Sequence, residues 1–235
     1  MAKMVGLSRN IKIQWLNKTV ELLSENLTED EIKEKLNEYL SFEIKSPTNL
    51  RKTREILLNI WVYENQYSAK LRDEALTLFQ SYPEYRLQIN WCMMLVAYPV
   101  FMDMCKLIGK ILEFQDEITL VQVKQKLFDE WGERTTLYHS IDKLIATLKN
   151  FEVLVCEKPG KYHVNKHKVN NVKIVDFMLY VIMRIDNSGY YALSELSSLK
   201  YLFPFEYIVK KEQVLENNKF VLNNFGGELS VAINE

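Results

Sequence analysis

The hydrophobic period of residues 118–164 changes partway along, and this change constrains the fold more than any other feature of the chain. The stretch reads ITLVQVKQKLFDEWGERTTLYHSIDKLIATLKNFEVLVCEKPGKYHV. Its apolar residues first recur every three or four positions, as on the buried face of a helix, and later alternate with polar residues, as in a strand. We therefore expect helices followed by a hairpin.

Short-range signals divide this stretch into its parts. Residues 118–120 are strand-like, a first helical pattern ends at Trp131-Gly132, and a second covers about 134–150. The alternating run that follows turns at Pro159-Gly160. Helix, tight turn, helix and two-stranded hairpin is the order of a winged helix-turn-helix. The expected fold class is mainly α with small β-hairpins around a winged helix-turn-helix core at residues 84–170.

The composition is that of a globular protein without a membrane segment. The 235 residues, 48% of them hydrophobic and 26% charged, suffice for one large domain or two small ones. Seven glycines and five prolines argue against long linkers and against an all-β fold. No apolar run is long enough to span a bilayer, and the first residues lack the apolar core of a secretory signal. Three widely spaced cysteines suit a reducing compartment, so we expect a cytoplasmic protein.

Residues 1–83 are expected to form an N-terminal helical region. Thr28 to Glu31 is a capping box, and Ser46-Pro47 combines a cap with a first-turn proline. Tyr82-Pro83 ends the region. Four helical patterns follow one another: Leu7 to Leu23, the residues after Thr28, Asn49 to Tyr63, and Leu71 to Phe79.

Residues 87–114 are apolar on most faces, which predicts a buried helix. Pro99 lacks a backbone donor and should kink or split this helix. The part from Val100 onward would then be the first helix of the winged unit. Residues 171–235 repeat the order of that unit with a helix, a short strand, short helices and a hairpin around 223–227. They are a possible second, degenerate winged helix whose acids accompany its lysines, so we assign it to packing or partner contact.

The second helix of the central stretch is the expected nucleic-acid reader, because the major groove admits a helix. Its N-terminal turn offers free N–H groups and a positive dipole end to a phosphate. Its long polar side chains could reach base edges or backbone. The candidate contacts on this helix are Arg134, Thr135, Thr136, Tyr138, His139 and Lys143.

The hairpin carries the stronger charge signal. The whole chain has a net charge of −1, but residues 131–173 hold eight Lys/Arg and four Asp/Glu, a local excess of +4. Phosphate contacts require such a local excess, because each one releases counterions. The candidate contacts on the wing are Lys158, Lys161, Lys166 and Lys168. Arg51 and Arg54 are either a solvated helix face or a second phosphate contact.

The sequence gives little support for a metal site or a catalytic site. Cys156, His163 and His167 have a C-x6-H-x3-H spacing, but a structural zinc site usually has a close Cys pair at one end. A Cys156/His163 nucleophile pair is imaginable across the hairpin, whereas an inward Cys156 would be an inert core thiol. No glycine-rich phosphate loop, HExxH or GxSxG motif occurs. We therefore expect no catalytic residues, no metal and no cofactor.

The layout resembles the accessory protein A family of BREX bacteriophage-exclusion systems. The features that carry the resemblance are SPTNLRKTREILLNIW at Ser46 to Trp61, the apolar central helix after it, and the winged-helix-like units. The resemblance implies a compact, mostly helical protein with winged-helix character and DNA binding. No individual functional residue is transferred, because no single motif is diagnostic.

Together these features predict a non-enzymatic accessory or regulatory protein that binds nucleic acid, with duplex DNA expected rather than RNA. The resemblance implies a place in a bacterial phage-defence system. The alternative is a protein-docking subunit of a larger assembly that uses the winged helix for protein contacts. Other subunits of a complex are therefore possible partners, and a membrane is not. A steep loss of binding with rising salt would favour nucleic acid.

Overall fold

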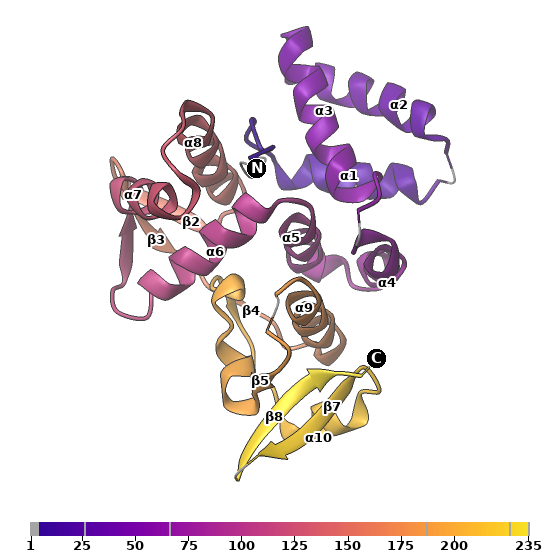
Figure 1. Ribbon diagram of the computed structural model, residues 1–235. Coiled ribbons are helices and arrows are strands. Elements are labelled where there is room, and N and C mark those ends of the chain that lie inside the picture. Colours follow the sequence, from indigo (N-terminus) through magenta and orange to yellow (C-terminus); the bar gives the residue numbers. More distant parts are fainter. Residues whose placement is uncertain (1–4, 26, 66, 187, 226, 235) are drawn as a thin grey trace.

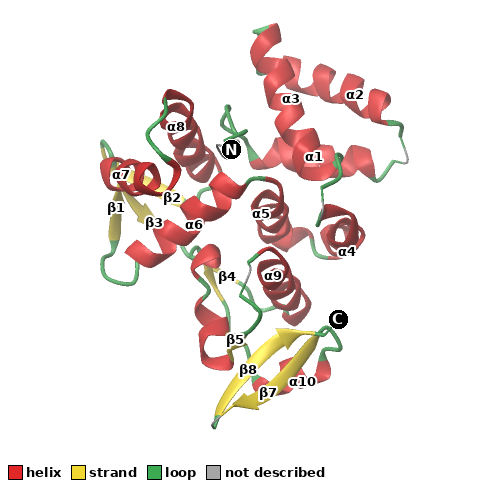
Figure 2. Cartoon of the chain, viewed as in Figure 1, coloured by secondary structure: helices red, strands yellow, loops and turns green. Residues whose placement is uncertain are grey.

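The computed structural model describes residues 5–25, 27–65, 67–186, 188–225 and 227–234. Over these residues the chain is mainly helical, with three small sheets (Figures 1 and 2). The prediction of a mainly α protein with small β-sheets is confirmed. No single described helix is both long and apolar enough to cross a membrane.

Four helices form the N-terminal region: α1 (Ile13–Leu23), α2 (Glu29–Ser41), α3 (Pro47–Trp61) and α4 (Ser68–Ser81). The Thr28 capping box and the Ser46 cap are both present. The prediction that the first helix begins at Leu7 is wrong. Residues 5–12 lie outside any helix, with Leu7 and Ile11 fully buried, because the Leu7 carbonyl accepts from Ser140 and the Ile11 N–H donates to Thr147.

The long apolar stretch is split, as Pro99 predicted. A 3-10 turn, η1 (Pro83–Tyr85), leads into α5 (Arg86–Ala97), and α6 (Pro99–Ile111) follows with Pro99 in its first turn. The two helices, with η1 included, bend by 117° at the break. Helix α5 is buried along most of its length and lies at the centre of the molecule (Figure 1). Its Trp91 packs edge-on against Phe101, Phe203 and Phe205.

After α6 come β1 (Glu117–Thr119), α7 (Leu120–Trp131), α8 (Thr135–Asn150), β2 (Leu154–Lys158) and β3 (Lys161–Val164). The strands form an antiparallel sheet in the order β1-β3-β2. Gly132 ends α7 with a φ of 77°, a conformation that favours glycine. The helices and the hairpin lie close to their predicted bounds, but Leu120 belongs to the helix and not to the strand.

The C-terminal part repeats this arrangement in reduced form. Its hairpin, β7 (Phe220–Phe225) and β8 (Glu228–Ile233), forms an antiparallel sheet with β5 (Tyr191–Ala192) in the order β5-β8-β7, the same relative order as in the first sheet. Strands β4 (His167–Lys168) and β6 (Phe205–Glu206) pair in parallel. Gly226, within the predicted hairpin turn, lies outside the described residues. The elements are β4 (His167–Lys168), α9 (Val172–Ile185), β5 (Tyr191–Ala192), η2 (Leu193–Ser198), η3 (Lys200–Leu202), β6 (Phe205–Glu206), α10 (Lys211–Glu216), β7 (Phe220–Phe225) and β8 (Glu228–Ile233).

A close backbone approach joins the two repeated parts. A Cβ atom added at Gly109 of α6 would lie 2.3 Å from the carbonyl oxygen of Lys200 in η3. Only glycine fits this crossing. The indole Nε1 of Trp91 donates to the next carbonyl, that of Tyr201, at 3.0 Å. Helices α5 and α6 are thereby joined to η3.

Candidate nucleic-acid interface

Helix α8 packs its apolar side into the core and has two flanks and one outer face. The flank toward α7 is closed by a polar and aromatic cluster. Lys124 pairs with Asp142 at 2.7 Å, and its ammonium lies 3.5 Å from the ring centre of Tyr138. Burial would lower the pKa of Lys124, but the contacts with Asp142 and Tyr138 together outweigh this and raise it. Tyr138, a candidate nucleic-acid contact, also stacks on Phe128, so its ring already makes contacts within the protein.

The other flank of α8 is covered by residues 5–11, here called the N-terminal segment. Ser140 donates to the carbonyl of Leu7, Ile11 N–H donates to Thr147 Oγ1 at 2.9 Å, and Asn150 Nδ2 donates to the carbonyl of Ile11 at 3.1 Å. The side chains of Ser140, Lys143, Thr147 and Asn150 follow at helical spacing and form what we call the seam stripe. Lys143, a predicted base contact, is thus a half-buried member of a covered flank.

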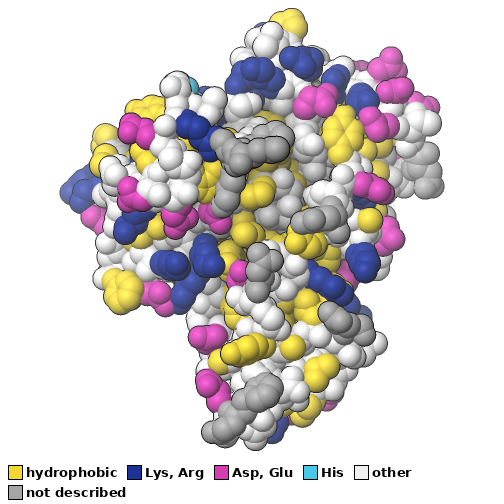
Figure 3. All heavy atoms as spheres, in the orientation of Figure 1, with side chains coloured by type: hydrophobic (Ala, Val, Ile, Leu, Met, Phe, Trp, Pro, Cys, Tyr) yellow, Lys and Arg dark blue, Asp and Glu magenta, His cyan; other side chains and the backbone are white. Residues whose placement is uncertain are grey.

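Between the two flanks, α8 leaves an outer face made of Thr135, His139, Asp142, Ala146 and Lys149, in which the half-buried Asp142 is the residue paired with Lys124. Thr135, His139 and Lys149 are exposed, as is Thr136 in the first turn. These residues recur at the spacing that places side chains on one side of a helix. Arg134 precedes the helix as its N-cap, is half-buried, and donates to the carbonyl of Trp131 at 3.4 Å. Figure 3 shows Lys and Arg side chains over α8 and over the upper end of α3.

The hairpin presents its cations unequally. Lys158 is exposed next to the turn, whereas Lys161 pairs with Glu117 on β1 at 2.6 Å. His163 Nε2 lies 3.7 Å from Glu117 and 3.5 Å from Glu157. The hydrogen bond from Lys161 holds the pKa of Glu117 below its ordinary value, and Lys158 adds to the effect. Glu117 therefore offsets part of the positive charge of the lysines on the wing.

Lys166 and Lys168 belong to a different surface. Lys166 Nζ donates to the carbonyl of Phe203 at 2.6 Å, and burial lowers its pKa. Lys166, a candidate contact on the wing, therefore lies beyond the hairpin with its ammonium bonded to the backbone that follows η3. Lys168 lies on β4, beside β6. Both residues line a hollow of about 920 Å³ between α6, α9 and α10.

The two arginines of α3 are also placed away from the hairpin. Arg54 pairs with Glu55 at 2.6 Å and donates to Asn37 at 3.1 Å, so its guanidinium ties α3 to α2. Arg51 is exposed and borders a shallow hollow between the same two helices. Figure 1 shows α3 and the hairpin on opposite sides of α8.

The candidate nucleophile and metal residues are not assembled into a site. Cys156 is exposed, so it does not point inward as the inert core thiol alternative required, and its thiol lies 3.3 Å from the carbonyl oxygen of Lys158. His167 lies on β4 against Phe205. Within the described part of the chain, no group of three His, Cys, Asp or Glu residues is placed to hold a metal ion.

A scan against protein-family models found no match for this chain, and searches of curated proteins and of solved structures found none either.

Proposed function

We propose that residues 99–164 form a winged helix that binds duplex DNA, with α8 entering the major groove and the β2–β3 hairpin as the wing. The observation that carries the proposal is the chain order α6, β1, α7, α8, β2, β3 with strand order β1-β3-β2 and an exposed outer face on α8. A helix presented in this way fits the width of the major groove.

The distribution of charge supports the same partner. Of the acids near α8 and the hairpin, Asp142 is paired with Lys124 and Glu117 with Lys161. Glu133, Glu152 and Glu157 are exposed and reduce the local excess of positive charge. Lys149 on the outer face and Lys158 at the turn are exposed cations, and His139 is an exposed side chain with hydrogen-bonding nitrogens. Cations at the rim position a duplex by its phosphates, while polar side chains between them can contact base edges.

In this proposal the protein has no catalytic activity and serves as an accessory or regulatory DNA binder. The resemblance of its layout to the accessory protein A family of phage-exclusion systems supports a role in phage defence. Its C-terminal part, which repeats the topology without an excess of base, would contact packing partners or other subunits.

The test is a salt titration of binding. A fluorescently labelled duplex of roughly 20 base pairs, about two helical turns, is titrated with protein from about 50 to 200 mM salt. We expect a steep log–log decline in affinity. The double substitution Lys149→Glu and Lys158→Glu should lower the slope by about 2, whereas the control Lys211→Glu on α10 should leave it unchanged. Absence of binding at the lowest salt would contradict the proposal.

A second candidate function, protein docking through the same unit, is favoured by one specific observation. Three large apolar side chains around the hairpin and α7 are exposed: Val121 by 78%, Val155 by 48% and Tyr138 by 45%. The N–H of Leu120 donates to the carbonyl of Gly160, which places Val121 beside the hairpin turn. Large exposed apolar side chains can contribute to a protein contact. Substituting Val121 by Asp would abolish such docking and leave DNA affinity nearly unchanged.

A further inference from the structure

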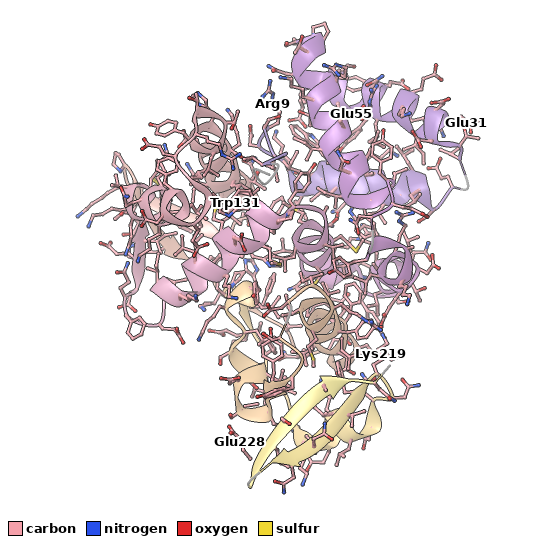
Figure 4. All side chains as sticks on the ribbon, in the orientation of Figure 1. Arg9, Glu31, Glu55, Trp131, Lys219 and Glu228 are labelled. Carbon is pink, nitrogen blue, oxygen red and sulfur yellow. The ribbon has the colours of Figure 1, made fainter. Side chains whose placement is uncertain are left out.

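The N-terminal segment is wedged between α8 and α3. It runs along the seam stripe of α8 from Leu7, opposite Ser140, to Ile11, opposite Thr147 and Asn150. Midway between these anchor points, Arg9 Nε donates to Asn49 Oδ1 of α3 at 3.1 Å. Figure 4 shows Arg9 in the gap between α8 and α3. The segment therefore carries an arginine to a fixed place between the two helices.

The guanidinium of Arg9 has more N–H donors than its contacts within the protein use. An arginine has five N–H donors, and those of Arg9 that are used go to Asn49 and to the carbonyl of Ser8. Both of these partners are neutral, and Arg9 forms no ion pair with a described residue. A half-buried arginine held by neutral partners keeps a full positive charge and a planar fork, which suits a phosphate.

Two lysines extend this charge to either side. Lys143 lies on the seam stripe between Ser140 and Thr147, at the level of α8 that the middle of the segment passes. Lys52 is exposed one turn beyond Asn49 on α3. Lys143, Arg9 and Lys52 thus form what we call the seam cations. The nearby acid Glu43 is bound by Lys12 and by Trp15 Nε1.

We propose that Arg9 binds the phosphodiester backbone of the duplex that α8 engages, on the side of α8 away from the wing. The inference rests on the proposed function. A helix in the major groove has a phosphate backbone on each side of it. Lys158 on the hairpin would meet one strand, and the seam cations would meet the other. The N-terminal segment is then a part of the interface and not only a packing element.

The experiment compares Arg9→Gln, Arg9→Lys and a matched control, Lys70→Gln, which removes an exposed cation on α4. The full chain and the same duplex are used over the same salt range. Arg9→Gln should lower the log–log salt slope by about 0.9, the contribution of one phosphate contact, and weaken binding several-fold at the lowest salt. Arg9→Lys should restore the slope, because it retains the charge. Lys70→Gln should change neither quantity.

A purely structural role for Arg9 has a different outcome. Asn49→Ala removes the partner of Arg9 and leaves the charge, so it should retain the salt slope even if the protein is less stable. The inference is overturned if the wild type binds the duplex and Arg9→Gln shows the slope of Lys70→Gln, or if Arg9→Lys fails to restore it. If the wild type binds no duplex at all, the proposed function itself fails.

Discussion

The substitution Thr147→Val tests whether the N-terminal segment is held on α8 as described. Thr147 is fully buried, and its hydroxyl makes two hydrogen bonds. It accepts from the N–H of Ile11 at 2.9 Å and donates to the carbonyl of Lys143 at 2.9 Å. Valine has nearly the same shape and is equally branched at Cβ, so the substitution removes the hydroxyl and little else.

The expected cost follows from the group left without a partner. The N–H of Ile11 would remain buried without an acceptor, which costs about 1–3 kcal/mol. The carbonyl of Lys143 lies in the middle of α8 and keeps its helical bond, so its loss is small. We therefore expect destabilisation by about 2 kcal/mol, equivalent to a fall in Tm of roughly 4–8 °C for a chain of this size.

Urea unfolding monitored by circular dichroism measures this difference. The matched control is Thr77→Val on α4, because Thr77 is exposed and its hydroxyl bonds only to the carbonyl four residues earlier, that of Asp73. The control should change the free energy of unfolding by less than about 0.5 kcal/mol, as surface substitutions usually do. Equal stabilities for the two variants would refute the hydrogen bond between Ile11 and α8.

Two further predictions concern contacts made by the C-terminal part. Gly109→Ala should destabilise the protein by about 3 kcal/mol, because the new methyl group would overlap the backbone of Lys200. The control is Gly189→Ala, whose new methyl group would meet nothing within 4 Å. Equal urea midpoints for the two variants would contradict the close approach. Tyr191→Phe should destabilise the protein more at pH 7 than at pH 3. Burial alone would raise the pKa of Asp186, but hydrogen bonds from Tyr191 and Ser188 lower it overall. Their stabilisation is therefore present above the unfolded carboxyl pKa of about 3.9 and is lost as pH falls through the lower folded value. Equal destabilisation in urea at both pH values would contradict this coupling.

Local signals in the sequence predicted most elements of the fold. The Thr28 capping box and the Ser46-Pro47 cap each act within one helical turn, so the chain can be read without knowledge of its partners. Pro99 splits the apolar stretch for the equally local reason that it lacks an N–H. The Pro159-Gly160 turn and the Gly132 helix end depend on backbone preferences of single residues.

Long-range contacts account for what the sequence did not predict. Leu7 and Ile11 have the spacing of a helix, but their backbone groups bond to Ser140 and Thr147, more than 130 positions away along the chain. Composition alone counted Lys161 as a free cation, whereas Glu117, 44 positions earlier, binds it. Charge counting shows how many cations a segment has, but not which acids or carbonyls fold against them.

The sequence predicted some residues of the candidate site and missed others. The exposed positions Thr135, His139 and Lys158 follow from helical period and turn position, and they are exposed in the structure. Arg9 was not identified from the sequence, because a single arginine in an apparently helical stretch gives no signal. The only sequence hint was the neighbouring glycine, Gly6, which takes a φ of 70° that is atypical of a helix.

Amine footprinting tests the central claim, that α8 and the hairpin face DNA, most directly. Lysines of the free protein and of its duplex complex are acylated, and the modified sites are quantified by mass spectrometry. We predict that duplex protects Lys149 and Lys158, and that Lys210 and Lys211 near α10 react equally in both states. Protection of Lys210 and Lys211 with unchanged reaction at Lys149 and Lys158 would contradict the assignment of the interface to α8 and the hairpin.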